Sequence, residues 1–336
     1  MKQFEIREFG IDKLALNEVD TPRPGPGEVL VRMRAASLNF RDYMVVAGTY
    51  NPKLKRPMIP LSDGAGVVES VGEGVTQFKH GDSVAGCFFQ GWLDGPPTRE
   101  KVRSALGGGI DGVLREYVVF SQDGLVPAPV GLSDEETATL PCAALVAWHA
   151  LFEDDAAAPG ETVLIQGTGG VSIFALQFAA AAGLRTIVTS GSDEKLARAR
   201  QLGASETINY KSTPDWDELA RKLTGGEGVD RVIEVGGRDT LPRSLKAVRM
   251  AGIVSVIGAL SGGEPSASAV PILMNSTRVQ GVYVGSRAMF RRMNRAIELH
   301  RIKPVIDRTF EWTEIRDALH YMETQQHFGK ICLRWG

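Results

Sequence analysis

The sequence predicts an α/β protein in which a doubly wound parallel sheet is combined with a β-barrel-type domain. Two observations carry this prediction. Short strand patterns separated by Gly and Pro fill the first third of the 336-residue chain, which is typical of an antiparallel, barrel-like domain. From Glu161 onward, strand and helix patterns alternate, which is typical of a parallel sheet covered by helices.

The composition is that of an ordinary globular protein, with 43% hydrophobic and 23% charged residues. The net charge of −2 offers no electrostatic reason to expect a nucleic-acid or membrane partner. No apolar run reaches the roughly 18 residues of a membrane span, residues 1–10 do not resemble a signal peptide, and the three cysteines are scattered. We therefore expect a soluble cytoplasmic protein whose partner is a small-molecule substrate.

The strand patterns of the β-rich part lie at residues 29–33, 66–72 and 81–86. Near residue 131 the pattern changes, and Ser133 and Glu136 form a capping-box pair that predicts a helix start. The continuous apolar run at 162–165 is typical of a strand buried on both faces. Further strands are expected at 186–189, 229–235, 252–257 and 278–284, and helices at 172–182, 194–202, 289–301 and 314–324. We place one domain at residues 1–129, completed by 285–336, around a parallel-sheet domain at 130–284.

The strongest chemical signal is the segment VLIQGTGGVS at residues 163–172, where a buried strand leads into a glycine turn and then a helix. The first glycine permits a tight turn, the second lets the backbone approach a pyrophosphate, and the helix N-terminus offers N–H donors to phosphates. Ser172 stands where this motif usually has Gly or Ala, and it is small enough for helix–strand packing. The alternative is a glycine-rich turn without a ligand. We predict a Rossmann dinucleotide site with the phosphate-binding residues Gly167, Thr168, Gly169, Gly170 and Val171.

The end of the next strand favours NADP(H) over NAD(H) as the cofactor. An NAD site normally has a carboxylate there for the ribose hydroxyls, whereas this strand is followed by Ser190 and Ser192, with Lys195 one helical turn on. A strand-end carboxylate would repel a 2′-phosphate, which carries about two negative charges. Asp193 and Glu194 come later, where they complement the dipole of a helix N-terminus. We predict that the two serines and the lysine bind the 2′-phosphate; the alternative for Lys195 is a solvated helix lysine.

Further motifs run nearly from end to end. They are PGPGEVLV at 24–31, SLNFRD at 37–42, DGAGVV at 63–68, GEGV at 72–75, LGA at 202–204, INY at 208–210 and GK at 329–330. Each is weak alone, but together and in this order the chain resembles the medium-chain dehydrogenase/reductase superfamily, in particular its zinc-independent quinone-reductase-like and enoyl-reductase-like branch. The resemblance implies a GroES-like catalytic domain, built from both chain ends around an inserted Rossmann domain.

Members of this family with catalytic zinc bind it through a Cys, a His-Glu pair and a second Cys. The matching positions are Asn39, Ser62-Asp63 and Cys142, so only Cys142 keeps the residue type of the family's zinc ligand. The closely spaced cysteines of the structural zinc are also missing, since residues 91–112 contain no Cys. We therefore expect no metal. A metal pair of Cys142 and His149 is the alternative to ordinary core packing of these two residues.

The resemblance also implies residues on the cofactor side. Tyr210 matches a tyrosine that packs near the adenosine 2′-phosphate in NADPH-using relatives, and Lys330 matches a lysine near the same end. Gly258-Ala259 and Val284, with the glycine that follows it, match strand ends that flank the nicotinamide.

On the substrate side, Asn39, Asp42 and Tyr43 match the lining stretch, although a structural role is the alternative for the last two. Without zinc, hydrogen-bond donors must polarise the substrate, which suits quinones, enones and enals with a conjugated electron sink. We predict hydride transfer to such a substrate, with Tyr43 and Ser62 as donors and the Asn39 amide orienting it. The alternatives are a zinc-dependent alcohol dehydrogenase acting on alcohols or aldehydes, and a non-catalytic NADPH-binding protein.

Two more segments carry expectations. Residues 95–112, with three consecutive glycines at 107–109, form either a mobile flap or a surface insertion. Residues 280–284 form a short apolar strand, expected at the edge of the parallel sheet. Pairing of this edge with its twin predicts a homodimer with Val282 and Val284 near the centre of the interface. The alternative is that a loop or the C-terminal helix of the same chain covers the edge.

Overall fold

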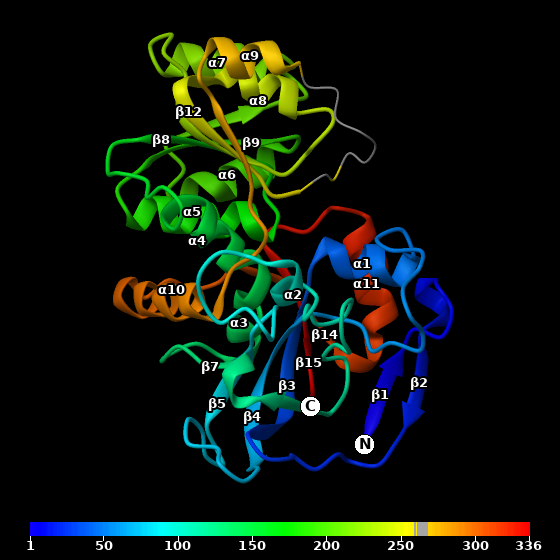
Figure 1. Cartoon of the computed structure of the whole chain (residues 1–336). Helices are drawn as coiled ribbons and strands as arrows, with labels where there is room; N and C mark the ends of the chain where they lie inside the picture. The colour runs from blue at the N-terminus through cyan, green and yellow to red at the C-terminus, as the bar shows by residue number, and fades with distance from the viewer. Residues whose placement is uncertain (259, 261–267) are drawn as a thin grey trace. The chain divides into compact units, whose positions relative to one another are not determined.

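The computed structural model describes residues 1–258, 260 and 268–336, which form two compact units (Figure 1). The two-segment unit consists of Met1–Leu145 and Val284–Gly336, and the central unit is Val146–Tyr283. The expected boundaries, 129/130 and 284/285, differ from these. Helix α3 (Asp134–Ala138) accounts for the difference at the first boundary, because it packs on the β-rich sheet and buries Ala138 against Ala35 and Ala65.

The central unit is built on a sheet of six strands in which every neighbouring pair is parallel. In spatial order the strands are β10 (Glu206–Asn209), β9 (Arg185–Ser190), β8 (Thr162–Gln166), β11 (Val229–Glu234), β12 (Val248–Val256) and β13 (Arg278–Gly281). The order reverses between β8 and β11, which is the point at which doubly wound sheets bind ligands.

Helices cover both faces of this sheet. Figure 1 shows α7 (Trp216–Leu223) and α8 (Leu241–Ala247) on one face, and α4 (Leu145–Phe152) and α5 (Gly170–Ala181) on the other. Every residue of β8 is buried, as its continuous apolar run predicts. Helices α6 (Asp193–Gln201) and α9 (Ala269–Met274) complete the unit. The predicted elements of this unit are present within a few residues of their expected ends, except that β13 ends at Gly281 instead of continuing to residue 284.

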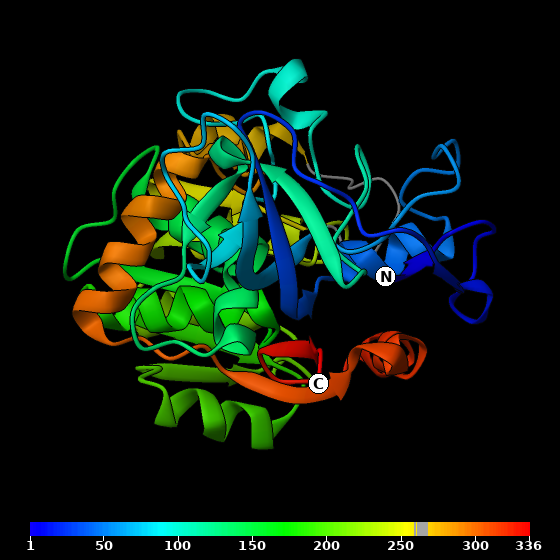
Figure 2. The same ribbon diagram turned by 90° about the horizontal axis from the view of Figure 1, so that it is seen from below.

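The two-segment unit contains a seven-stranded sheet to which both chain ends contribute. Its strands are β14 (Ile306–Glu311), β15 (Lys330–Arg334), β3 (Glu28–Leu38), β4 (Asp63–Val71), β5 (Ser83–Gly86) and β7 (Leu125–Pro127), with β6 (Tyr117–Ser121) also paired to β3. Only β14 and β15 run parallel; the other pairs are antiparallel. Figure 2 shows the orange and red C-terminal strands beside the blue N-terminal ones. The expected folding together of the two ends is thereby confirmed.

Smaller elements surround this sheet. They are the hairpin of β1 (Lys2–Glu5) and β2 (Ala15–Glu18), and the helices α1 (Phe40–Ala47), α2 (Arg99–Val102), α3, α10 (Arg287–His300) and α11 (Ile315–Glu323). Helix α3 begins at the predicted capping box, in which Glu136 N donates to Ser133 Oγ at 3.1 Å and Ser133 N to Glu136 Oε2 at 2.9 Å. A π-helical segment, Leu140–Ala144, follows it and contains Cys142. Among the described helices, none is both long and apolar enough to traverse a bilayer.

Candidate functional site

The glycine turn after β8 has the geometry that a dinucleotide requires. Gly167 adopts a φ of 73°, which favours glycine, and Gly169 is the N-cap of helix α5. A Cβ placed on Gly169 would meet no atom within 4 Å, so the backbone is open to an approaching phosphate. Thr168 lies in the turn, and Gly170 and Val171 form the first turn of α5, whose N–H groups lack intrahelical partners as in any helix. This cradle fits the pyrophosphate of a nicotinamide dinucleotide.

Ser172 closes the turn. Its hydroxyl donates a hydrogen bond to the Gln166 carbonyl oxygen at 2.6 Å, and the residue is buried. The serine therefore ties the first turn of α5 to the end of β8, which explains how it replaces the small apolar residue usual at this position.

A buried carboxylate that the sequence analysis missed lies at the reversal point of the sheet. Glu234, at the end of β11, is fully buried and accepts hydrogen bonds from the backbone N–H groups of Gly236 and Gly237 at 2.8 and 2.9 Å. Its other oxygen accepts from the Gln166 amide at 2.8 Å and the Ser244 hydroxyl at 2.5 Å. The carboxylate thus ties the loop after β11 to the last residue of β8 and to helix α8. Glutamate at the end of a strand is too common for sequence alone to single it out.

The serines at the end of β9 have structural partners. Ser190 Oγ accepts from Ser192 N at 3.3 Å, and Ser192 Oγ caps α6 by accepting from Lys195 N at 3.4 Å. Both hydroxyls still have a proton to donate to a phosphate. The carboxylate of Asp193 accepts a hydrogen bond from the Asn209 side chain at 2.7 Å, so a neutral amide is bound to this negative group.

Tyr210 lies beside the same strand end, as the resemblance implies. Its N–H donates to the Ser190 carbonyl at 3.1 Å, and 45% of the residue is exposed. A Cβ on Gly191 would come within 2.9 Å of both the Tyr210 hydroxyl oxygen and Lys211 Cε, so these two side chains lie directly over the backbone there. Lys211 is a second cation at this position, which the sequence analysis missed although it follows the tyrosine directly.

The residues expected to flank the nicotinamide occupy constrained positions. At Gly258 a Cβ would lie 2.8 Å from the Val235 carbonyl oxygen, so only glycine fits between the ends of β11 and β12. Ala259 lies outside the described residues. Val284 is buried and adopts a φ of 52°, a left-handed conformation that is strained for a β-branched residue. Such strain is common at ligand sites, and contact with the nicotinamide stays a prediction for both residues.

The substrate-side residues meet in the two-segment unit because three strands end at the same place. Ile331 pairs with Leu38 across β15 and β3, and Ser37 pairs with Asp63 across β3 and β4. The adjoining residues Asn39, Ser62, Asp63 and Lys330, here called the buried polar cluster, are therefore brought together. Their exposed fractions range from 0 to 9%.

Hydrogen bonds and one ion pair connect this cluster. The Lys330 ammonium donates to the Leu38 carbonyl and to Asn39 Oδ1, both at 2.7 Å, and lies 3.6 Å from Asp63 Oδ2. Asn39 Nδ2 is 3.4 Å from Ser62 Oγ, which donates to Asp63 Oδ1 at 3.4 Å. Burial raises the pKa of Asp63, while the ammonium and hydrogen bonds from its neighbours oppose that rise.

The donor set of the cluster does not fit zinc. Zinc is usually held by three or four thiolate, imidazole or carboxylate ligands, whereas this position offers an amide, a hydroxyl, an ammonium bonded to the amide oxygen, and a single carboxylate that is paired with this ammonium. Burial, with a further contribution from Asp63, raises the pKa of the Cys142 thiol. In the described part of the chain, no three His, Cys, Asp or Glu side chains are grouped as a metal would require. His149, proposed as a partner of Cys142, has its Nε2 3.2 Å from Asp154 instead.

One expectation for an individual residue needs correction. Lys330 was expected near the 2′-phosphate of the cofactor; its ammonium is buried among oxygen atoms of the two-segment unit, because β15 pairs with β3. The hydroxyl of Tyr43 donates to Glu323 at 2.8 Å, which also raises the pKa of the phenol, and its role as a donor to the substrate stays a prediction. Ser62 lies in the cluster as expected but is fully buried.

The glycine-rich end of the loop at residues 95–112 packs against Leu61 and Arg41, which lie next to cluster residues in the sequence or on α1. Leu61, which precedes Ser62, adopts a φ of 71°, and a Cβ on Gly112 would lie 2.1 Å from its carbonyl oxygen. Arg41 of α1 donates to the Leu106 carbonyl at 3.0 Å, and its guanidinium lies 4.9 Å from the centre of the Phe88 ring. The glycines permit this close backbone contact, so the loop supports the strained corner before Ser62.

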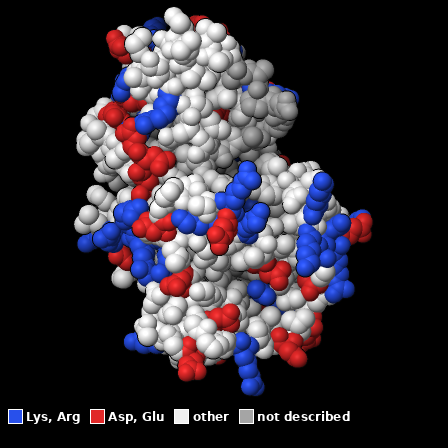
Figure 3. Space-filling model, viewed as in Figure 1, with Lys and Arg blue, Asp and Glu red and all other residues white. Residues whose placement is uncertain are grey.

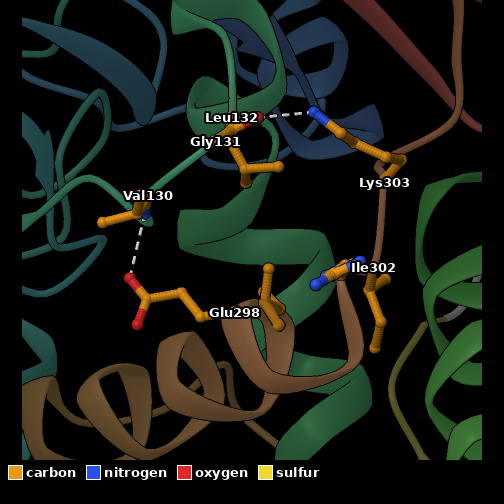
Figure 4. Close-up of a pocket in the computed structure, with 8 residues that line it drawn as sticks. Val130, Gly131, Leu132, Glu298, Ile302 and Lys303 are labelled. Carbon is orange, nitrogen blue, oxygen red and sulfur yellow. Dashed lines mark hydrogen bonds between the residues drawn. The ribbon is translucent and has the colours of Figure 1, made fainter.

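A pocket elsewhere in the two-segment unit contains none of the predicted site residues (Figure 4). Its volume is about 460 Å³. Glu298 accepts a hydrogen bond from Val130 N at 2.9 Å, and Lys303 donates to the Gly131 carbonyl at 2.5 Å. These charged groups therefore hold the turn at residues 130–132 against the end of α10, and the pocket does not extend the candidate site.

Comparisons with known proteins agree with this architecture. The model of the alcohol dehydrogenase GroES-like domain matches residues 25–130, and that of the zinc-binding dehydrogenase family matches residues 170–299. A zinc-type alcohol dehydrogenase-like protein of Schizosaccharomyces pombe is 48% identical over 332 residues, which cover 97% of this chain and 96% of that protein. A quinone oxidoreductase of Rattus norvegicus is 33% identical over 262 residues, covering 77% and 73%.

Solved structures of similar fold contain or use both forms of the cofactor. An NAD-dependent alcohol dehydrogenase is 33% identical with a TM-score of 0.91, and the match covers 100% of each chain. The crotonyl-CoA carboxylase/reductase AntE in complex with NADP is 25% identical with a TM-score of 0.86, covering 99% of this chain and 94% of that one.

The arrangement around Gly191 predicts a preference for NADPH. We expect NADPH to bind at least about tenfold more tightly than NADH, a difference of about 1.4 kcal/mol. Lys195→Ala and Lys211→Ala should each weaken NADPH binding about fivefold or more and leave NADH binding unchanged, because only NADPH carries the 2′-phosphate. Fluorescence titration measures both constants, and Lys222→Ala on α7 is the matched control. Equal dissociation constants for the two cofactors would contradict the prediction.

The environment of Asp42 predicts a pH-dependent stability. Burial is the largest cause that raises the pKa of this carboxyl to about 6, and its Oδ1 has no hydrogen-bond partner in the described structure. Because the folded-state pKa is above the unfolded value of 3.8, stability falls as pH rises from about 4 through 6, by up to about 3 kcal/mol. At pH 8, Asp42→Asn should therefore be about 1–3 kcal/mol more stable than the wild type, and below pH 4 the difference should vanish. Parallel melting curves at several pH values test this, and a constant difference would refute it.

Proposed function

Because the chain belongs to the medium-chain dehydrogenase/reductase superfamily, we propose that it is a zinc-free, NADPH-dependent oxidoreductase that transfers a hydride to a quinone or to an activated alkene or carbonyl compound. The observation that carries this proposal is the buried polar cluster. It contains hydrogen-bond donors and one ammonium where relatives with catalytic zinc have metal ligands. Similarity to a quinone oxidoreductase and to a 2-haloacrylate reductase also favours conjugated substrates.

The residues of this chain have separate tasks in the proposed reaction. The cradle from Gly167 to Val171 would bind the pyrophosphate, and Ser190, Ser192, Lys195, Tyr210 and Lys211 would bind the 2′-phosphate end. The bound cofactor would supply the hydride. The Asn39 amide would orient the substrate oxygen, and water or a nearby acid would protonate the product.

Further features support a small-molecule role. Acidic and basic side chains lie interspersed over much of the face in Figure 3, which gives no reason to propose a nucleic-acid partner. The three cysteines are free thiols, and we extend the proposal to a cytoplasmic location, where reduced cysteines persist.

We also propose that the protein is a homodimer formed through the edge of the parallel sheet. In the described sheet, β13 has a neighbour only on the β12 side, and helix α9 beside it in sequence exposes 62–77% of Val270, Leu273 and Met274. The expectation that Val282 and Val284 form the interface centre was wrong, because both are buried within their own chain, at 5% and 6% exposure. Self-pairing of β13 would satisfy its open N–H and C=O groups and cover the apolar face of α9.

The proposed activity predicts NADPH oxidation in the presence of naphthoquinones, enones or enals, at rates at least about 100-fold above those with simple ketones or primary alcohols, because only conjugated acceptors carry their own electron sink. Activity should persist after chelation, and elemental analysis of protein purified without chelator should find far less than one zinc per chain. Stoichiometric zinc with alcohol oxidation would support the dehydrogenase alternative. NADPH binding without turnover of any substrate would support a non-catalytic role.

The proposed dimer predicts a mass in solution of twice the chain mass of 36.3 kDa. Leu273→Asp, which places a charge on the exposed face of α9, should shift the protein to the monomer because an unpaired charge in an apolar interface is costly. Leu299→Asp on α10, where 77% of the leucine is also exposed, is the control and should leave the mass unchanged. Light scattering at micromolar concentration decides the matter, and a monomeric wild type refutes the dimer.

A further inference from the structure

We infer that Lys330 is a positioning residue that turns the Asn39 side chain into an obligate hydrogen-bond donor, and that the Asn39 amide N–H binds the substrate's oxygen. This inference rests on the proposed function and assigns the donor within that site. It concerns residues that the fold brings together from opposite ends of the chain, since 291 positions separate Lys330 from Asn39.

The chemistry of the two partners determines the orientation of the amide. An ammonium group can only donate hydrogen bonds, and Lys330 Nζ lies 2.7 Å from Asn39 Oδ1. In the flipped orientation the amide NH₂ would face the ammonium, and two donors would oppose each other at a lysine that is only 3% exposed. The amide oxygen therefore faces Lys330, and Nδ2 faces Ser62 at 3.4 Å.

The cluster forms a ring of hydrogen bonds with a single direction. Lys330 donates to Asn39, Asn39 donates to Ser62, and Ser62 donates to Asp63 Oδ1, while Asp63 Oδ2 lies 3.6 Å from the Lys330 ammonium. Ser62 has one hydroxyl proton, and the Asp63 carboxylate accepts it. Because Ser62 is fully buried and its proton is bonded, it has no donor left for a substrate.

Asn39 is the member of the ring with the largest exposed fraction, 9% of the whole residue. Its Nδ2 carries two protons and lies 3.4 Å from Ser62 Oγ, and a hydrogen bond from the same side chain lowers the pKa of Asp63. The contact with Ser62 is long, so a substrate oxygen would take the proton that points to it. Tyr43, the other candidate donor, has its hydroxyl bonded to Glu323 at 2.8 Å. The ligand that fits one directed N–H is a hydrogen-bond acceptor, such as the oxygen of a quinone or a conjugated carbonyl.

The orientation can be tested without any activity. A neutron structure of the deuterium-exchanged wild-type protein distinguishes an amide ND₂ from an amide oxygen. We expect the ND₂ group on the Ser62 side and the oxygen against Lys330. The reverse arrangement would overturn the inference, whether or not the enzyme turns over the proposed substrates.

The role in the reaction is tested by kinetics with a naphthoquinone and NADPH. Asn39→Asp keeps an acceptor for Lys330 but removes the donor, so kcat should fall about 100-fold while the NADPH dissociation constant stays within twofold. Asn39→Ala, which adds no charge, should give a similar loss. Lys330→Met should lower kcat about tenfold because the amide is no longer held, and Lys330→Arg should recover most of that loss. Lys303→Met, which removes a lysine paired with Glu136 in the same unit, should match the wild type.

A double variant separates positioning from charge balance. Lys330→Met combined with Asp63→Asn removes both charges of the buried ion pair, and we expect its kcat to stay about tenfold below that of the wild type with a normal melting temperature. Wild-type kcat in this double variant, or in Asn39→Asp and Asn39→Ala, would overturn the inference. A wild-type enzyme that turns over no conjugated substrate would refute the proposed function instead, and the amide orientation would still be decided by the neutron structure.

Discussion

The pairing of β15 with β3 is the contact on which the substrate side depends. Antiparallel hydrogen bonding places Ile331 opposite Leu38, so Lys330 reaches the residues that follow β3. The apolar side chains on these strands, among them Ile331 and Leu333, are fully buried and stabilise the pairing. The ammonium then lies among oxygen atoms that only this register brings together. A shift by one residue would turn Lys330 to the other face of the sheet, and the cluster would not form.

The central unit contains a buried charge of the opposite sign that is stabilised in the same way, by hydrogen bonds. Glu234 is a buried carboxylate surrounded by donors, as Lys330 is a buried ammonium surrounded by acceptors. A buried charge is tolerated only when its hydrogen-bonding capacity is met, so each charge immobilises the backbone that supplies its partners. Glu234 ties the loop after β11 to the end of β8, and Lys330 holds the junction of β3 and α1. Each of these charged groups lies at a strand end, where a ligand can approach.

Local signals predicted the parts of the structure that are local in origin. The capping box at Ser133, the buried strand β8 and the turn at Gly167 each depend on a few adjacent residues, and each was expected in its place. Lys330 was misplaced, and the partner of Tyr43 was not foreseen, because both depend on contacts across long separations, whereas Lys211 was missed although it directly follows Tyr210. Lys330 gave no sign of pairing with β3, and Tyr43 gave no sign of bonding to Glu323, 280 residues away. The extent of β13 was misjudged because an apolar pattern continues beyond Gly281: Val282 and Val284 are buried there, although only Val282 N still donates to β12, at the Val256 carbonyl.

The choice of an amide over a metal constrains the substrate in the proposed reaction. A zinc ion bonds directly to a substrate oxygen with its full charge, so it can activate an isolated carbonyl. The positive charge of Lys330 is shared among the Leu38 carbonyl, the Asn39 amide oxygen and Asp63, so a substrate would meet only the polarised N–H of Asn39. One such donor lowers a barrier by about 2.7–4 kcal/mol, which is the effect of a single oxyanion-hole hydrogen bond. The remaining stabilisation of the developing negative charge must come from the substrate, and conjugated carbonyl compounds and quinones provide it by delocalisation. The geometry of one lysine therefore bears on which molecules the site can reduce.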